Sequence, residues 1–219
     1  MTLLINVVSK NFSIMSADKR VNIRDENRKT LSIYDNFNKI IRTKNNKIII
    51  GISGNARNHK YIDKIKGMEK PEEVISVIKK FVYENNDISK ALKYPEVEYG
   101  LDSGLCSFIF NNSFYTLTYA TCLIESKISL FENDSKKISF FPFGSGFDEF
   151  KEIVETKEFK NKREIINDID GINNKILKTK KLLTYIFEKV SRKNNSVSKE
   201  YFSYLSTKRK NEFKLMKSS

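Results

Sequence analysis

Thr2 is the residue whose position and chemistry point most directly to a reaction. Removal of Met1 would leave the α-amine of this threonine beside its own hydroxyl, and threonine is small enough for that removal. An α-amine has a near-neutral pKa, so it can take the hydroxyl proton directly or through one water, without a histidine. Such a site also needs a cation that lowers the pKa of the hydroxyl, an anion that holds this cation, and an N–H group facing the developing oxyanion.

Few other groups in the chain could carry catalysis. The sequence has one histidine, His59, and two cysteines, Cys106 and Cys122. A serine–histidine–aspartate arrangement would therefore have to use that single histidine. Two cysteines cannot build a disulfide framework, and no cluster of cysteine or histidine has the spacing of metal ligands. We expect neither a metal site nor a cofactor.

The chain is strongly basic, with 40 lysine and arginine residues against 27 aspartate and glutamate residues and a formal net charge of +13. The lysines are either scattered over solvated faces, as in the product of an AT-rich coding sequence, or gathered into a surface that binds nucleic acid. The densest basic segments, 157–163, 175–181 and 208–214, alternate with acidic or apolar positions and match no nucleic-acid-binding module. We therefore favour the scattered arrangement, with nucleic acid not an expected partner and only weak, salt-sensitive binding to polyanions.

Length and composition bound the fold class. A chain of 219 residues can bury about 70% of its unfolded surface, which favours one domain over residues 1–219. The apolar stretch at residues 3–8 is too short for a membrane span and lacks the basic flank of a signal peptide. We expect a cytoplasmic protein with no membrane partner.

The pattern of apolar residues predicts strands first and then alternating groups of helices and strands. Strands are expected at 3–8, 12–17, 39–42, 47–52, 105–110, 114–120, 122–131 and 138–143, with a loop at 19–29. Helices are expected from Pro71 to Val82, from Phe147 onwards and over 174–190. Residues 191–219 suggest one more packed element before a basic and possibly mobile tail at 206–219. This order predicts a layered α+β domain with helices packed on two sheets.

Five segments resemble the catalytic β-subunits of proteasomes and the related bacterial ATP-dependent protease subunit, which are threonine-dependent N-terminal-nucleophile (Ntn) hydrolases. These segments are Thr2, Met15-Ser16-Ala17-Asp18-Lys19-Arg20-Val21, Asn38-Lys39-Ile40, Gly51-Ile52-Ser53-Gly54 and Gly144-Ser145-Gly146. The interval from Thr2 to Asp18 matches the family without a gap, whereas the loop before Lys39 is a few residues longer. The resemblance covers residues 2–54 and about 140–158, and it implies the four-layer αββα Ntn-hydrolase sandwich.

The resemblance also implies roles for individual residues. Thr2 would be nucleophile and base, Lys39 the ammonium that depresses the hydroxyl pKa, and Asp18 the carboxylate that orients Lys39. Gly51 would supply the oxyanion N–H, Ser145 would hold the terminal amine or its water, and Ser198 would match the late serine of the family. The chain departs from the family at Asn195, which stands where the family has an acid, and in the absence of the glycines that usually follow.

Each of these residues also has a purely structural interpretation. Asp18 and Lys39 could form an ion pair that only stabilises the fold. Gly51 could allow close backbone packing, and Ser145 could cap a helix.

The resemblance places the substrate-binding residues after the second strand, at Arg20, Val21 and Asn22, together with Ser53. An exposed Arg20 would favour acidic or polar substrate residues. The implied function is hydrolysis of a peptide bond through an acyl ester on Thr2; the alternatives are an Ntn-type protein ligase or transpeptidase, and a non-catalytic binding or assembly subunit. The implied partners are a peptide or protein substrate, further copies of the chain, possibly in a ring, and an ATP-dependent unfoldase.

Overall fold

The computed structural model describes residues 2–24, 30–54, 64–91, 102–120 and 127–216. Within these residues, antiparallel strands form two five-stranded sheets and one two-stranded sheet. The first sheet has the order β10 (Ser139–Gly144), β1 (Leu3–Ser9), β2 (Phe12–Asp18), β11 (Tyr201–Thr207), β12 (Lys214–Leu215). The second has the order β5 (Ile40–Arg42), β6 (Ile48–Gly54), β7 (Asp102–Phe110), β8 (Ser113–Ala120), β9 (Lys127–Asn133). The pair β3 (Arg20–Arg24) and β4 (Thr30–Asp35) forms the third.

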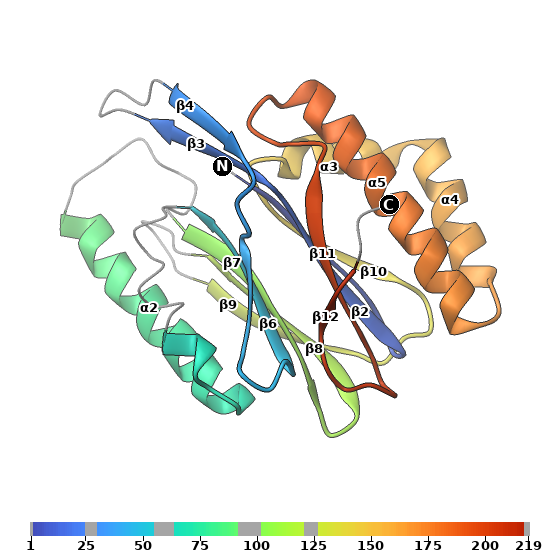
Figure 1. Cartoon of the computed structure of the whole chain (residues 1–219), viewed down its shortest axis with the longest axis horizontal. Helices are drawn as coiled ribbons and strands as arrows, with labels where there is room; N and C mark the ends of the chain where they lie inside the picture. The colour runs from blue at the N-terminus through green and yellow to red at the C-terminus, as the bar shows by residue number, and fades with distance from the viewer. Residues whose placement is uncertain (1, 25–29, 55–63, 92–101, 121–126, 217–219) are drawn as a thin grey trace.

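The two large sheets lie face to face, and helices cover both outer faces (Figure 1). The helix α2 (Pro71–Ala91) packs on the second sheet, where Val74 and Ile78 contact the cluster that includes Ile50. The helices α3 (Phe147–Glu155), α4 (Lys157–Asp168) and α5 (Ile172–Lys193) cover the first sheet. No helix among the described residues is both long enough and apolar enough to cross a membrane.

Strand β1 is buried along its whole length because the first sheet has a layer on each face. Its side chains alternate, so Leu3 and Ile5 pack toward the helices while Leu4 packs between the sheets. The space between the sheets also holds a polar network, in which the Asn6 amide donates to Thr116 Oγ1 at 3.0 Å. These alternating contacts explain the continuous apolar run at the start of the sequence.

Three regions contain ordered structure that the sequence did not predict. The loop expected at 19–29 begins with β3, which is held by pairing with β4 rather than by burial. The basic segment at 157–163 lies in α4, whose N-cap Thr156 accepts a hydrogen bond from the Phe159 N–H at 3.2 Å. The segment 206–219, expected as a tail, begins inside β11, and its described part includes Phe213, which is fully buried between the sheets. Part of the strand expected at 122–131 lies outside the described residues, and β9 begins at Lys127.

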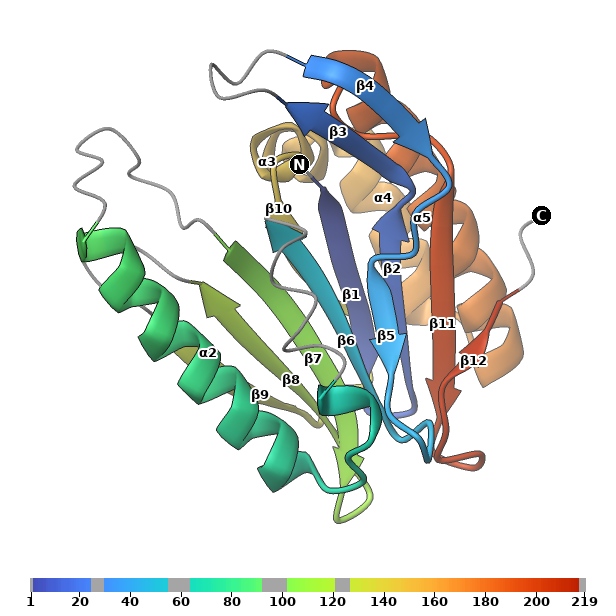
Figure 2. The same ribbon diagram turned by 60° about the vertical axis from the view of Figure 1, so that its left-hand side comes forward.

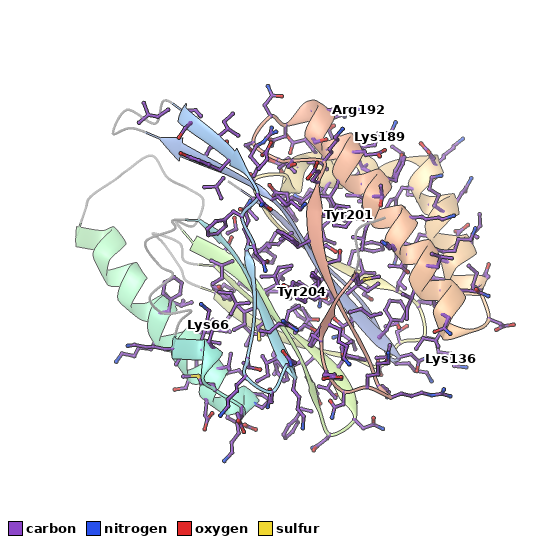
Figure 3. All side chains as sticks on the ribbon, viewed as in Figure 1. Lys66, Lys136, Lys189, Arg192, Tyr201 and Tyr204 are labelled. Carbon is purple, nitrogen blue, oxygen red and sulfur yellow. The ribbon has the colours of Figure 1, made fainter. Side chains whose placement is uncertain are left out.

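Strand β11 is the packed element expected within 191–219. It pairs with β2, and Figure 3 labels Tyr201 on this strand. The Tyr201 ring stacks on Phe187 of α5 with ring centroids 4.4 Å apart. Tyr204, three residues later, lies in the cluster between the two sheets. Because β11 joins both clusters, the loop between α5 and β11 is fixed at the end of β2 near Asp18.

Candidate active site

The predicted site residues lie at one end of the first sheet. Strands β1, β2 and β10 are antiparallel neighbours, so the start of β1 lies beside the ends of β2 and β10. Leu3 is paired with Gly144, and Leu4 with Ala17, which leaves Thr2 next to Ser145 and close to Asp18. Figure 2 shows the N-terminus at this end, below the β3–β4 pair. The first sheet therefore brings together Thr2, Asp18 and Ser145.

Asp18 and Lys39 form a buried ion pair with Nζ 2.9 Å from Oδ1. The same Oδ1 accepts the Leu3 N–H at 2.7 Å, so the ammonium lies within two hydrogen bonds of the Thr2–Leu3 peptide. Oδ2 accepts the N–H groups of Arg20 at 3.0 Å and Ser198 at 3.4 Å. Lys39 Nζ also donates to the Arg20 carbonyl. The pair is thus fixed by backbone groups from three segments of the chain.

Burial decides the titration of this pair. It lowers the pKa of Lys39 from its usual value, against the attraction and hydrogen bond of Asp18. It raises the pKa of Asp18, against the charge and hydrogen bond of Lys39 and the N–H groups of Leu3 and Arg20. The site needs the charged form of Lys39, which the carboxylate and hydrogen bond of Asp18 favour against this burial.

Ser145 contacts the Thr2 backbone nitrogen, which becomes the α-amine once Met1 is removed. The Thr2 N–H donates to Ser145 Oγ at 3.0 Å. The N-cap of α3 is Gly146 and has no side-chain cap, so the Ser145 hydroxyl does not cap this helix. The structure therefore contradicts the interpretation of Ser145 as a helix cap.

The residues beside Ser145 come from the loop between α5 and β11, and the sequence did not identify them. Ser145 Oγ lies 3.2 Å from Ser196 Oγ, and Asn194 Oδ1 accepts the Ser196 N–H at 3.0 Å. The signal in the sequence is Asn194-Asn195-Ser196, because an asparagine often accepts the backbone N–H two residues later.

The other members of this loop have different contacts from those expected. Ser198 lies near Asp18 through its backbone N–H, while its hydroxyl accepts the Glu200 N–H at 3.1 Å. Asn195 contributes its carbonyl oxygen, which accepts from Arg20 Nη1 at 2.8 Å. The side chains that approach Ser145 are therefore those of Asn194 and Ser196, whereas the family role expected for Ser198 stays a prediction.

Two glycines allow close approach around Thr2. A Cβ on Gly51 would lie 2.9 Å from Leu4 Cδ2, so the glycine permits β6 to pack on β1. Gly51 is paired in the sheet with Ile40 and Leu105, and its role as an oxyanion donor stays a prediction. Gly144 has a φ of +100°, and a Cβ there would lie 1.9 Å from the Thr2 carbonyl oxygen. Ser53 Oγ would be 3.1 Å from that same Cβ, so the expected substrate-binding Ser53 lies beside Thr2.

The other predicted substrate-binding residues lie on β3, and Arg20 is already paired. Its guanidinium contacts both carboxylate oxygens of Asp35 at 2.7 Å. These hydrogen bonds raise the pKa of Arg20 and lower that of Asp35. The Arg20 charge is therefore compensated by Asp35, and its preference for acidic substrate residues stays a prediction. Val21 and Asn22 are half-buried, and no described residue hydrogen-bonds Asn22 Oδ1.

Among the described residues, no group of three or more histidine, cysteine, aspartate or glutamate side chains could hold a metal ion. The arrangement that the structure does contain is a threonine at position 2, a buried lysine paired with an aspartate, and a serine that accepts the Thr2 N–H. These are three of the groups that a threonine nucleophile needs.

No protein-family model matches the chain, and no curated protein matches it in sequence. Among solved structures, the chain is similar to the Gly-1 mutant of Anbu from Hyphomicrobium sp. strain MC1. The TM-score is 0.61 at 13% sequence identity, and the match covers 99% of this chain and 85% of that chain. At this identity the likeness shows the fold alone. The chain therefore has a proteasome-like fold, as the resemblance in its sequence predicted.

Proposed function

We propose that the chain is a proteasome-like, threonine-dependent amide hydrolase that cleaves peptide bonds. The observation that carries this proposal is the shared oxygen of Asp18, which accepts both Lys39 Nζ and the N–H of the residue after Thr2. This contact fixes a buried ammonium close to the only residue whose amine and hydroxyl could act together. We also propose that the two sheets and their helices form the four-layer sandwich of the Ntn hydrolases.

The proposed reaction begins when removal of Met1 frees the Thr2 amine. The amine takes the proton from the Thr2 hydroxyl, and the oxygen attacks the carbonyl carbon of the substrate. The resulting oxyanion is stabilised by an N–H group, for which Gly51 is the candidate. The protonated amine then gives its proton to the leaving nitrogen, so the C–N bond breaks and an acyl ester remains on Thr2. Water attacks this ester with the amine again as base, which releases the acid and restores Thr2.

Lys39 and Asp18 act on the first step in this proposal. The ammonium of Lys39 stabilises the developing negative charge on the Thr2 oxygen. Asp18 keeps the ammonium in place and compensates for its burial. Ser145 accepts a hydrogen from the amine, which leaves the amine lone pair for the hydroxyl proton.

The test uses a chain released from an N-terminal fusion so that Thr2 is its first residue, called the processed chain. A peptide epoxyketone or β-lactone should modify Thr2, which intact mass and peptide mapping would detect. The matched control is the same chain with Met1 retained, in which the amine is blocked and no labelling is expected. Thr2→Ser should retain some labelling because serine keeps both groups, and Thr2→Ala should retain none. A processed chain that folds and is never labelled would contradict the proposal.

Processing in the natural host is a separate prediction. The protein isolated from its own cells should begin at Thr2, because the amine is free only after Met1 is removed. Intact mass measurement of native material decides this. Retained Met1 would leave a non-catalytic binding or assembly subunit as the better interpretation. Added amine nucleophiles would distinguish hydrolysis from transfer of the acyl group, which is the ligase alternative.

A further inference from the structure

A series of hydrogen bonds leads from Thr2 through Ser145, Ser196 and Asn194 to the carboxylate of Glu149. Glu149 is in the first turn of α3, and its Oε1 accepts from Asn194 Nδ2 at 3.1 Å. The same nitrogen donates to the Ser145 carbonyl at 2.9 Å. The other oxygen of Glu149 is buried, and no described residue hydrogen-bonds it. A buried carboxylate oxygen without a hydrogen bond costs free energy.

The contacts of Asn194 fix the orientation of its amide. Its Nδ2 faces two groups that only accept, the Ser145 carbonyl and the Glu149 carboxylate, and its Oδ1 faces the Ser196 N–H. Oδ1 also contacts Ser196 Oγ, so the Ser196 hydroxyl must donate its hydrogen to Asn194. In the alternative orientation, the amide oxygen would face the Ser145 carbonyl and the Glu149 carboxylate, and the amide nitrogen would face the Ser196 N–H.

The orientation of Asn194 determines the direction of the remaining hydrogen bonds. Ser196 Oγ has given its hydrogen to Asn194, so it can only accept from the Ser145 hydroxyl, 3.2 Å away. The other contact open to that hydroxyl, the Thr2 carbonyl, is longer at 3.4 Å. Ser145 Oγ is then left as the acceptor for the Thr2 nitrogen. Every hydrogen in the series therefore points away from Thr2 and toward Glu149.

We propose that Glu149 is a positioning residue that acts through Asn194 and Ser196 to keep Ser145 as the acceptor of the Thr2 amine. This inference rests on the proposed role of Thr2. Glu149, on α3, supplies a carboxylate that the chain lacks at Asn195, where the family that the sequence resembles has an acid. Glu149 favours the protonated form of the amine, because each hydrogen bond in the series strengthens when its acceptor becomes more negative.

Other charges act on the same amine and must stay unchanged in the test. Asp18 and Lys39 face Thr2 from β2 and from the start of β5. Arg20, paired with Asp35, reaches the loop that carries Ser196 through the Asn195 carbonyl. On α3, Glu152 pairs with Lys193 of α5 at 2.6 Å and is exposed. Glu152 is therefore a matched control, since it is a glutamate on the same helix that does not contact the series.

The experiment measures the pKa of the Thr2 amine directly, by NMR titration of the processed chain grown with 13C-labelled threonine. Glu149→Gln keeps the side-chain shape and an acceptor oxygen but removes the charge, so the pKa of the amine should fall by about half a unit. Glu152→Gln should leave it unchanged. Glu149→Gln combined with Asn194→Asp puts a carboxylate next to Ser196 and should return the pKa to the wild-type value or above.

The outcomes separate this inference from the proposed function. A lower pKa of the Thr2 amine in Glu149→Gln and its recovery in the double variant support the positioning role, even if the wild-type chain is never labelled by an electrophile. An unchanged pKa in Glu149→Gln, in a chain whose thermal unfolding matches the wild type, overturns it while leaving labelling of Thr2 intact. If Glu149→Gln does not fold, the double variant decides. A folded double variant in which the pKa of the Thr2 amine stays below the wild-type value overturns the inference. Failure of both variants to fold also overturns it, because the role of Glu149 would then be structural.

Discussion

A buried ion pair responds to the loss of one partner differently from an exposed pair. Asp18 is fully buried and Lys39 is only 6% exposed, so Lys39→Ala would leave an uncompensated carboxylate in the interior. We expect this variant to lose about 3 kcal/mol of unfolding free energy. Lys47→Ala, which removes an exposed lysine, should change it by less than about 0.5 kcal/mol. Denaturant unfolding would measure both.

Stability and chemistry can be separated at this pair. The double variant Asp18→Asn with Lys39→Met removes both charges, so it should recover much of the lost stability. It should still not be labelled at Thr2, because the ammonium is absent. A double variant that folds and is labelled at the wild-type rate would show that the pair is structural only.

The pH dependence of labelling should report the ionisation of Lys39. The rate should fall at alkaline pH as Lys39 loses its proton. The Asp18 carboxylate favours the charged form and raises the pKa of Lys39, so Asp18→Asn should move this fall to lower pH. Asp35 acts in the same direction but more weakly, so Asp35→Asn should give a smaller shift of the same sign. A shift to higher pH in either variant would contradict the assignment.

Single residues with strong chemical requirements could be predicted from the sequence, and residues that act through orientation could not. Thr2, Asp18, Lys39 and Ser145 stand at fixed places relative to strand ends, and the structure brings them together. Asn194 and Ser196 are polar residues in a polar loop. Their contact with Ser145 depends on how β11 joins β2, which no local pattern encodes.

At the scale of elements, the end of β10 controls the position of Thr2. Gly144 and Gly171 both have a positive φ, at +100° and +87°, but only Gly144 has neighbours within 4 Å of its would-be Cβ. Gly171→Ala should lower the free energy of unfolding by about 1 kcal/mol, because it adds backbone strain alone. Gly144→Ala should lower the free energy of unfolding by about 3 kcal/mol or more, because it adds both backbone strain and a clash with the Thr2 carbonyl.

Thermal unfolding of the two glycine variants gives the comparison, and labelling of the processed Gly144→Ala chain should be lost. Equal destabilisation of the two variants would show that the contact between Gly144 and Thr2 is unimportant.

Elements with two buried faces were predicted well, and elements with little burial were missed. The strand pattern at 3–8 and 12–17 matches β1 and β2 because both faces of these strands need apolar side chains. Strand β4 has mostly exposed side chains, so its sequence lacks the pattern of a buried strand. Helix α4 buries only Phe159 and Ile166, and its many lysines concealed that spacing.

At the scale of the whole molecule, the positive charge is spread over several faces. Lys66, Lys136 and Lys189 lie far apart from one another in Figure 3. Binding to duplex DNA should therefore be weak and should vanish at moderate salt, because only diffuse phosphate contacts are available. A titration at low and moderate ionic strength would test this, and tight, salt-resistant binding would favour a nucleic-acid partner.

Assembly is the other property of the whole molecule that we predict. We propose a homo-oligomer in the form of a ring, with an ATP-dependent unfoldase as its partner. Sedimentation at low micromolar concentration should then show a species well above 25.6 kDa. A charge of +13 on each copy opposes association, so the assembled fraction should increase with ionic strength. A monomer at every salt concentration would favour a ligase or a small-substrate amidase.

The contacts of Thr2 join parts of the chain that are synthesised far apart in time. Thr2 meets Ser145 across 143 positions, and Asp18 meets Ser198 across 180. At the usual speed of translation, these partners leave the ribosome about ten seconds or more after the N-terminus. An amine freed while the chain is still short has no acceptor at Ser145 until β10 has been synthesised. Early removal of Met1 would therefore leave Thr2 without its hydrogen-bond acceptor until two thirds of the chain has been synthesised.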